Sequence, residues 1–162
     1  MSKNNVWLKT AAFTACMTAI VYALPHFWWG LGISLAFPGD FNSVPNDPVG
    51  NFIAYWVMGI ISLAAAVFAF AFVLPWGKRI PRLLLLIPAW LGAIGLTVWG
   101  FGFIYLRFFL FIGRVESAPA FALQDSDPTA VGWATFWYGL FIIWGIALGT
   151  AAFQFKKTHS TL

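Results

Sequence analysis

Four long apolar runs dominate the chain and limit what it can fold into. They cover residues 6–35, 48–74, 81–112 and 128–155. A helix that rises about 1.5 Å per residue crosses the hydrocarbon core of a bilayer with about 20 apolar residues. Each run is long enough to do so. We therefore predict an all-α polytopic membrane protein with four transmembrane helices in an up-down bundle, forming a single domain over 162 residues.

The composition excludes the usual water-soluble classes. The chain is 61% hydrophobic and 9% charged, whereas soluble domains have about 45–50% apolar and about 25% charged residues. The net charge of +4 does not indicate nucleic-acid binding, because the basic residues stand in short clusters between apolar runs. Cys16 is the only cysteine, and no His, Cys and Asp residues have metal-ligand spacing. We therefore expect no nucleic acid, no metal and no cofactor.

The charges separate to the two ends of the predicted helices, and short loops rich in Lys and Arg favour the cytoplasmic side. Seven of the nine basic residues fall on the side of the two termini: Lys3, Lys9, Lys78, Arg79, Arg82, Lys156 and Lys157. The opposite side carries all the acids together with two arginines: Asp40, Asp47, Glu116, Asp125, Asp127, Arg107 and Arg114. We therefore predict that both termini are cytoplasmic and that both acidic loops lie on the outer side.

Both acidic loops end in the same dipeptide, Asp47-Pro48 and Asp127-Pro128. Asp is a good helix N-cap, since its carboxylate accepts from a free backbone N–H. Pro suits the next position, because the N–H it lacks would be unpaired there. Each half of the chain is thus an outgoing helix, an acidic loop, an Asp-Pro cap and a returning helix with a basic end. This layout favours a two-hairpin internal repeat. The alternative is that any outer loop that leads into a helix favours Asp-Pro.

His26 is the first candidate functional residue. It follows Lys9 by 17 residues, which is roughly 25 Å along a helix and near the outer edge of a core about 30 Å thick. An ionisable side chain within a span is a functional hypothesis by default. Pro25 precedes it, and we expect this proline to interrupt the helix and free carbonyl groups. The structural alternative is an interfacial histidine hydrogen-bonded to a neighbour beside a belt of aromatic residues.

Arg107 is the second candidate, at or just below the outer interface. Its side chain can reach headgroup phosphates, pair with an outer acid, or hold an anionic ligand with its planar guanidinium. Most of the ten tryptophans lie near span ends, as interfacial anchors do. Trp90, Trp99 and Trp144 lie deeper, and they gain interest only if they line a cavity. Our candidate outer-face site for a ligand or partner is His26, Trp29, Tyr55, Tyr105 and Arg107.

These residues support three functional hypotheses. The leading one is a small non-enzymatic bundle that binds membrane lipids, a hydrophobic small molecule or a membrane-protein partner near its outer face. The second is a membrane enzyme acting on a lipid or isoprenoid substrate, with His26 as acid/base and Arg107 holding an anionic headgroup. The third is a transporter or channel formed by homo-oligomerisation. Polar residues in the middle of the spans are few, among them Thr14, Ser62 and Thr97. They offer few side chains to line a polar pore.

Two stretches resemble a known family. The sequence YALPHFWWGLG at residues 22–32 resembles the opening of the small bacterial membrane proteins grouped as domain-of-unknown-function family 3995. The sequence WGKRIPR at residues 76–82 resembles the short basic turn of such proteins. The resemblance implies a four-helix, multi-pass protein of the bacterial cell membrane. It implies no reaction, because the family has no established activity.

Overall fold

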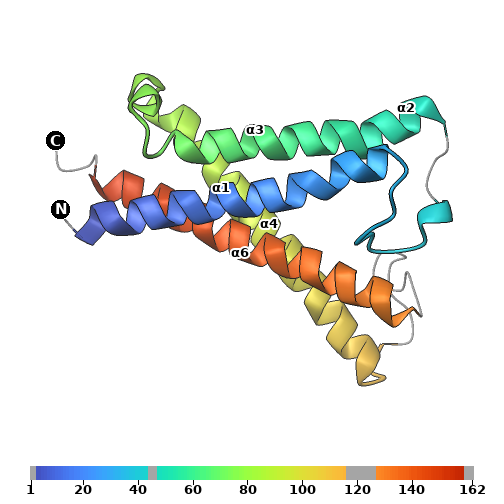
Figure 1. Ribbon diagram of the computed structural model, residues 1–162. Coiled ribbons are helices and arrows are strands. Elements are labelled where there is room, and N and C mark those ends of the chain that lie inside the picture. The colour runs from blue at the N-terminus through green and yellow to red at the C-terminus, as the bar shows by residue number, and fades with distance from the viewer. Residues whose placement is uncertain (1–2, 44–46, 116–126, 159–162) are drawn as a thin grey trace.

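The computed structural model describes residues 3–43, 47–115 and 127–158. Within these ranges the chain is mainly helical, and its long helices are α1 (Lys3–Gly30), α3 (Met58–Phe70), α4 (Arg82–Phe111) and α6 (Pro128–Thr158). The described part contains four helical stretches long and apolar enough to cross a membrane. Successive long helices run in opposite directions, so both termini lie at one end of the molecule (Figure 1). The prediction of an all-α, four-helix up-down membrane protein is confirmed.

The second spanning stretch is built from three segments in one continuous helix. It begins with α2 (Pro48–Asn51), continues through the π-helical η2 (Phe52–Val57) and ends with α3. At its start, the Oδ1 atom of Asp47 accepts a hydrogen bond from the backbone N–H of Gly50 at 2.7 Å. Likewise, the N–H of Thr129 donates to Oδ1 of Asp127 at 3.0 Å at the start of α6. Both predicted Asp-Pro caps are confirmed, whereas Glu116 and Asp125 lie outside the described residues.

The helices pack in the spatial order α3, α1, α6 and α4. The close contacts are those of α1 with α3, α1 with α6, and α4 with α6. α1 and α6 thus form the centre, and alanines allow them to pack closely. Ala12, Ala15 and Ala19 of α1 are fully buried, as are Ala151 and Ala152 of α6. The flanking helices α3 and α4 bury less of their surface than α1 and α6 do.

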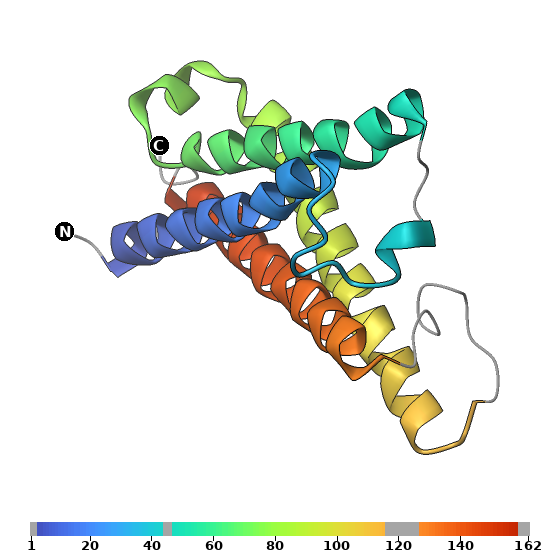
Figure 2. The ribbon, with the colours of Figure 1, turned by 45° about the vertical axis from the view of Figure 1, so that its right-hand side comes forward.

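The two hairpins predicted from the sequence are present, but they are not packed symmetrically. α1 pairs with α3, and α4 pairs with α6. A two-fold axis along the membrane normal would relate the α1–α6 contact to an equal contact between α4 and α3. Only sparse contacts join α3 and α4 within the described ranges. The hairpins diverge away from the termini, so that α4 lies far from α3 at that end in both views (Figures 1 and 2).

We call the end with the termini the terminal end and the opposite one the loop end. The first span differs from the prediction at the loop end. Pro25 does not interrupt α1, which continues to Gly30, five residues short of the predicted Leu35. After Gly30 the chain turns, with Gly32 at a positive φ of 84°, and forms the short helix η1 (Phe41–Ser43). At the terminal end α3 stops at Phe70 rather than at residue 74, and η3 (Pro75–Arg79) carries the basic turn.

Candidate functional site

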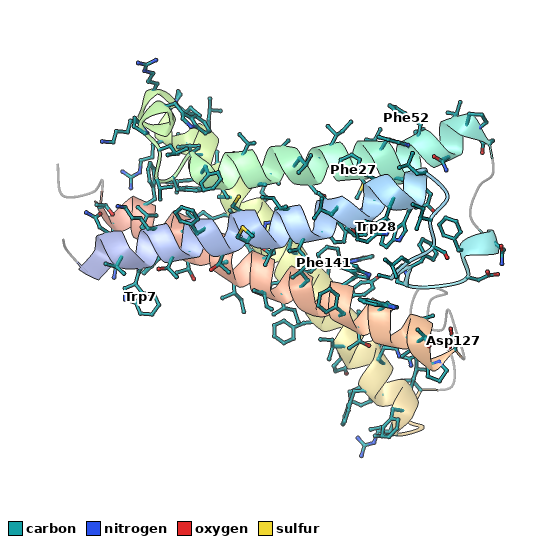
Figure 3. The ribbon with its side chains drawn as sticks, viewed as in Figure 1. Trp7, Phe27, Trp28, Phe52, Asp127 and Phe141 are labelled. Carbon is teal, nitrogen blue, oxygen red and sulfur yellow. The ribbon has the colours of Figure 1, made fainter. Side chains whose placement is uncertain are left out.

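An aromatic cavity of about 550 Å³ lies between the two hairpins in the half of the molecule nearer the loop end. All four spanning stretches contribute to its wall, and so does the loop after α1. Phe141, on α6, is one of these wall residues and lies in this crowded aromatic region (Figure 3). The described lining residues include one histidine and eight aromatic residues: His26, Tyr22, Trp29, Phe37, Tyr55, Trp99, Trp137, Tyr138 and Phe141.

Ring contacts between α1 and α6 fix the base of the cavity. On α1, residues four and seven positions after Tyr22 share its face of the helix, which places His26 and Trp29 on the same wall. The Tyr22 ring centroid lies 4.6 Å from that of His26 and 4.8 Å from that of Phe141. Trp29 lies edge-on to Trp137 at 6.1 Å. Such tilted and edge-to-face contacts each contribute about 0.5–1.5 kcal/mol beyond burial.

His26 offers one ring nitrogen to the cavity. The side chain is only 5% exposed, and its Nδ1 lies 2.9 Å from the carbonyl oxygen of Tyr22. A carbonyl oxygen can only accept, so Nδ1 is the donor and carries the proton in a neutral ring. The second nitrogen, Nε2, is then an acceptor, and no hydrogen bond to it is found among the described residues. A ligand can therefore satisfy this atom.

Tyr55 brings a second unsatisfied polar atom to the wall. Its side chain is 5% exposed, and its hydroxyl is buried with no hydrogen-bond partner in the described part of the chain. A buried hydroxyl without a partner costs about 1–3 kcal/mol. Tyr55 lies in the π-helical segment η2, and π-bulges occur frequently at functional sites. Tyr55 thus lines the cavity, while its hydroxyl is buried behind the surface and lacks a partner among the described residues.

The loop after α1 closes the cavity at the loop end. The indole N–H groups of Trp28 and Trp29 both donate to the carbonyl oxygen of Leu35 at 2.9 Å. Trp137 of α6 donates to the carbonyl of Ala36 at 2.9 Å. Phe37 then places its ring edge-on against Trp29 at 5.2 Å. Three tryptophans thus hold an apolar loop in place by satisfying its backbone carbonyls, and Trp28 lies at this end of α1 (Figure 3).

The α4–α6 side of the cavity is a stacked wall. The Tyr138 ring is parallel to that of Phe103 at 3.9 Å, and Tyr138 forms a side-chain hydrogen bond with Trp99. Gly95 also lines the cavity. A Cβ atom placed on Gly95 would meet nothing within 4 Å, so the cavity extends up to the backbone of α4 at this point.

The cavity opens sideways between α3 and α4, where contacts between the hairpins are sparse. Met58 on α3 and Trp99 on α4 line the cavity and remain 40% and 54% exposed. These exposed apolar side chains lie on helices long and apolar enough to span a membrane, so the rim of the cavity on this side is apolar.

Three of the five residues predicted as a site meet in this cavity: His26, Trp29 and Tyr55. Tyr105 is 61% exposed and packs against Phe109 at 4.5 Å. Arg107 is half-buried on α4. Neither is among the described lining residues, so their part in a ligand site stays a prediction.

Sequence reasoning missed the α6 wall. Trp137 was interpreted as an interfacial anchor, and Tyr138 and Phe141 were not selected, although Trp137, Phe141 and Trp144 repeat every three or four residues. That spacing places aromatic rings on one helix face and is the signal that could have found them. Trp99 does line the cavity. No group of His, Cys, Asp and Glu that could hold a metal ion occurs within the described ranges.

No family model matches the chain, and no curated protein or solved structure matches it either. The resemblance to family 3995 therefore stays a prediction. The site itself must carry the functional argument.

Proposed function

We propose that the protein is a non-enzymatic membrane protein that binds a lipid-like ligand in the aromatic cavity. The observation that carries this proposal is an aromatic cavity of about 550 Å³ whose lining residues include His26 and Tyr55. Nε2 of His26 has no hydrogen bond among the described residues, and the buried hydroxyl of Tyr55 has no partner there. Ligand sites are mostly apolar hollows of about 300–1,000 Å³ with a few placed polar groups. The sideways opening lets a ligand enter from the bilayer.

The proposal includes an orientation and a location. We infer that the cavity lies in the outer half of a bacterial cell membrane, with both termini in the cytoplasm. In support, basic side chains gather at the terminal end, where Arg82 of α4 donates to the carbonyl oxygen of Lys156 on α6 at 3.1 Å. The capping carboxylates of Asp47 and Asp127 lie at the loop end.

A membrane enzyme with His26 as acid/base is the second candidate. The free Nε2 atom in the cavity favours it, because a neutral imidazole nitrogen can take a proton from a bound substrate. The hypothesis also assigned Arg107 to an anionic headgroup, and Arg107 is not among the described lining residues. Only half of the proposed catalytic pair therefore faces the cavity. Binding without chemistry needs no second group and is the simpler proposal.

Native mass spectrometry of the protein purified in mild detergent tests the binding proposal. We expect a co-purifying hydrophobic adduct on the wild-type protein. Gly95→Leu places a side chain in the cavity with no clash at its Cβ and should reduce the adduct at least fivefold. Gly102→Leu is the matched control, since it lies on the same helix, also meets nothing within 4 Å and does not line the cavity.

Three results would contradict the proposal. They are a wild-type protein that carries no adduct from any membrane lipid extract, equal adducts on the two variants, and a chemically altered ligand. The last result would favour the enzyme. The same spectra report homo-oligomers and bound membrane proteins. A protein partner found in place of the lipid adduct would favour a protein-binding role instead.

A further inference from the structure

The polar atoms of the cavity suit one class of headgroup. We propose that the ligand is an uncharged lipid alcohol whose hydroxyl donates a hydrogen bond to Nε2 of His26. This inference rests on the proposed function and adds the ligand's chemistry to it. It follows from three properties of the wall: the tautomer of His26, the lack of charge among the described lining residues, and the position of Tyr55.

The tautomer decides what the headgroup must supply. Nδ1 of His26 donates to the Tyr22 carbonyl at 2.9 Å, which leaves Nε2 of the neutral ring as an acceptor. A ligand that satisfies Nε2 must bring a donor. An alcohol has one, whereas an ether, an ester or a ketone has only acceptors. The histidine therefore selects for a headgroup with a donor, and a hydroxyl is the donor that lipid alcohols carry.

The absence of charged side chains among the described lining residues disfavours a phosphate or carboxylate headgroup. None of the described lining residues is Lys, Arg, Asp or Glu. An ionised group moved among aromatic rings without a partner loses its hydration and gains nothing comparable. The same cost favours the neutral form of the His26 ring. A neutral headgroup fits this wall, and an anionic phospholipid head does not.

Tyr55 can take part in the same hydrogen-bond chain. The Trp29 ring contacts both polar residues: its centroid lies 4.9 Å from that of His26 and 6.2 Å from that of Tyr55. One headgroup beside this indole therefore lies near both residues. A hydroxyl has one donor and two acceptor positions. It can donate to Nε2, and a small shift of the Tyr55 side chain would bring its buried, unpartnered hydroxyl within reach to donate to the same headgroup. The apolar chain then leaves past Met58 and Trp99 into the bilayer.

A series of three ligands with one common chain tests this inference. Isothermal titration calorimetry in mild detergent would measure Kd for geranylgeraniol, its methyl ether and its monophosphate. We expect the alcohol to bind wild-type protein at least tenfold more tightly than either derivative. His26→Phe keeps a ring in the wall and removes the acceptor, so its alcohol-to-ether preference should fall below twofold. The preference is a ratio within one variant and is insensitive to a partly unfolded fraction.

The outcomes separate the two proposals. Equal binding of alcohol and ether, tighter binding of the phosphate, or no binding of the alcohol overturns the lipid-alcohol inference. So does a His26→Phe variant that keeps the full preference. None of these results removes a lipid adduct from native mass spectra or changes its dependence on Gly95, so the native mass spectra alone decide the proposed function. Gly102→Leu serves as a control, because Gly102 does not line the cavity and a Cβ atom there meets nothing within 4 Å.

Discussion

The hydroxyl of Tyr55 is the clearest case in which the stability of the fold and the binding of a ligand favour different side chains. It is buried without a partner in the described structure, and removing such a group recovers up to about 1–3 kcal/mol of desolvation cost. We therefore predict that Tyr55→Phe raises the midpoint of thermal unfolding in detergent while it weakens ligand binding. Circular dichroism and the native mass spectra measure the two effects.

The exposed Tyr105 provides the comparison for Tyr55. Tyr105→Phe removes a hydroxyl from a side chain that is 61% exposed, so it should leave the unfolding midpoint unchanged. A Tyr55→Phe protein that unfolds at a lower temperature and still binds its ligand would show that the hydroxyl is structural.

The residues of the site were only partly predictable for a physical reason. His26 stands out because an ionisable group within a span is costly, and Trp29 and Tyr55 are predicted on the same outer face. In the sequence, Trp137 lies near the end of a span and cannot be told from a tryptophan that anchors the helix at the interface. Its role depends on the Ala36 carbonyl, 101 positions earlier in the chain. A contact between segments so distant has no local signal in the sequence.

At the scale of elements, glycine sets how closely α4 and α6 approach. A Cβ atom on Gly145 would lie 2.8 Å from the carbonyl oxygen of Ala93 and 2.9 Å from the backbone nitrogen of Thr97. Backbone atoms cannot move aside as a flexible side chain can. We predict that Gly145→Ala pushes these helices apart and lowers the unfolding midpoint of the protein in detergent.

Gly139→Ala is the matched substitution on the same helix. A Cβ atom there meets nothing within 4 Å, and alanine is about 1 kcal/mol better than glycine in a helix interior. This variant should unfold at the same or a higher temperature. If both variants shift the midpoint alike, close approach at Gly145 is not what holds α4 against α6.

The helices themselves were predictable, because apolar runs of this length and their Asp-Pro caps are local features. The end of α1 was not. An apolar stretch to Leu35 suggested helix, yet the chain leaves the helix at Gly30. Backbone carbonyls outside a helix need partners in an apolar setting. Trp28, Trp29 and Trp137 supply them to Leu35 and Ala36, and only the tertiary structure brings those donors together.

At the scale of the whole molecule, unequal packing of the hairpins creates the cavity. The two halves share a layout in sequence, which would suit a closed, two-fold bundle. The α1–α6 contact has no equal between α3 and α4 within the described ranges. The arrangement of rings and alanines that produces this difference is spread over all four helices. No single sequence pattern therefore predicts a side opening, although the proposed entry of a ligand from the bilayer depends on it.

The orientation of the whole molecule decides which leaflet the cavity can sample. Positive residues at the terminal end should hold that end in the cytoplasm, so we expect the loop end to face outward. Cysteine labelling tests this cleanly, since the native Cys16 is only 1% exposed and should not react. In intact bacterial cells, a membrane-impermeant maleimide should label Ser34→Cys, on the exposed loop after α1, and should leave Lys157→Cys unlabelled.

Permeabilised cells provide the internal control for this experiment. Lys157 is exposed at the terminal end, so Lys157→Cys should react once the reagent enters the cytoplasm, and wild-type protein should stay unlabelled throughout. The opposite pattern in intact cells would place the cavity in the inner leaflet. The ligand would then have to come from lipids made or held on the cytoplasmic side, and the basic clusters would need another explanation than orientation.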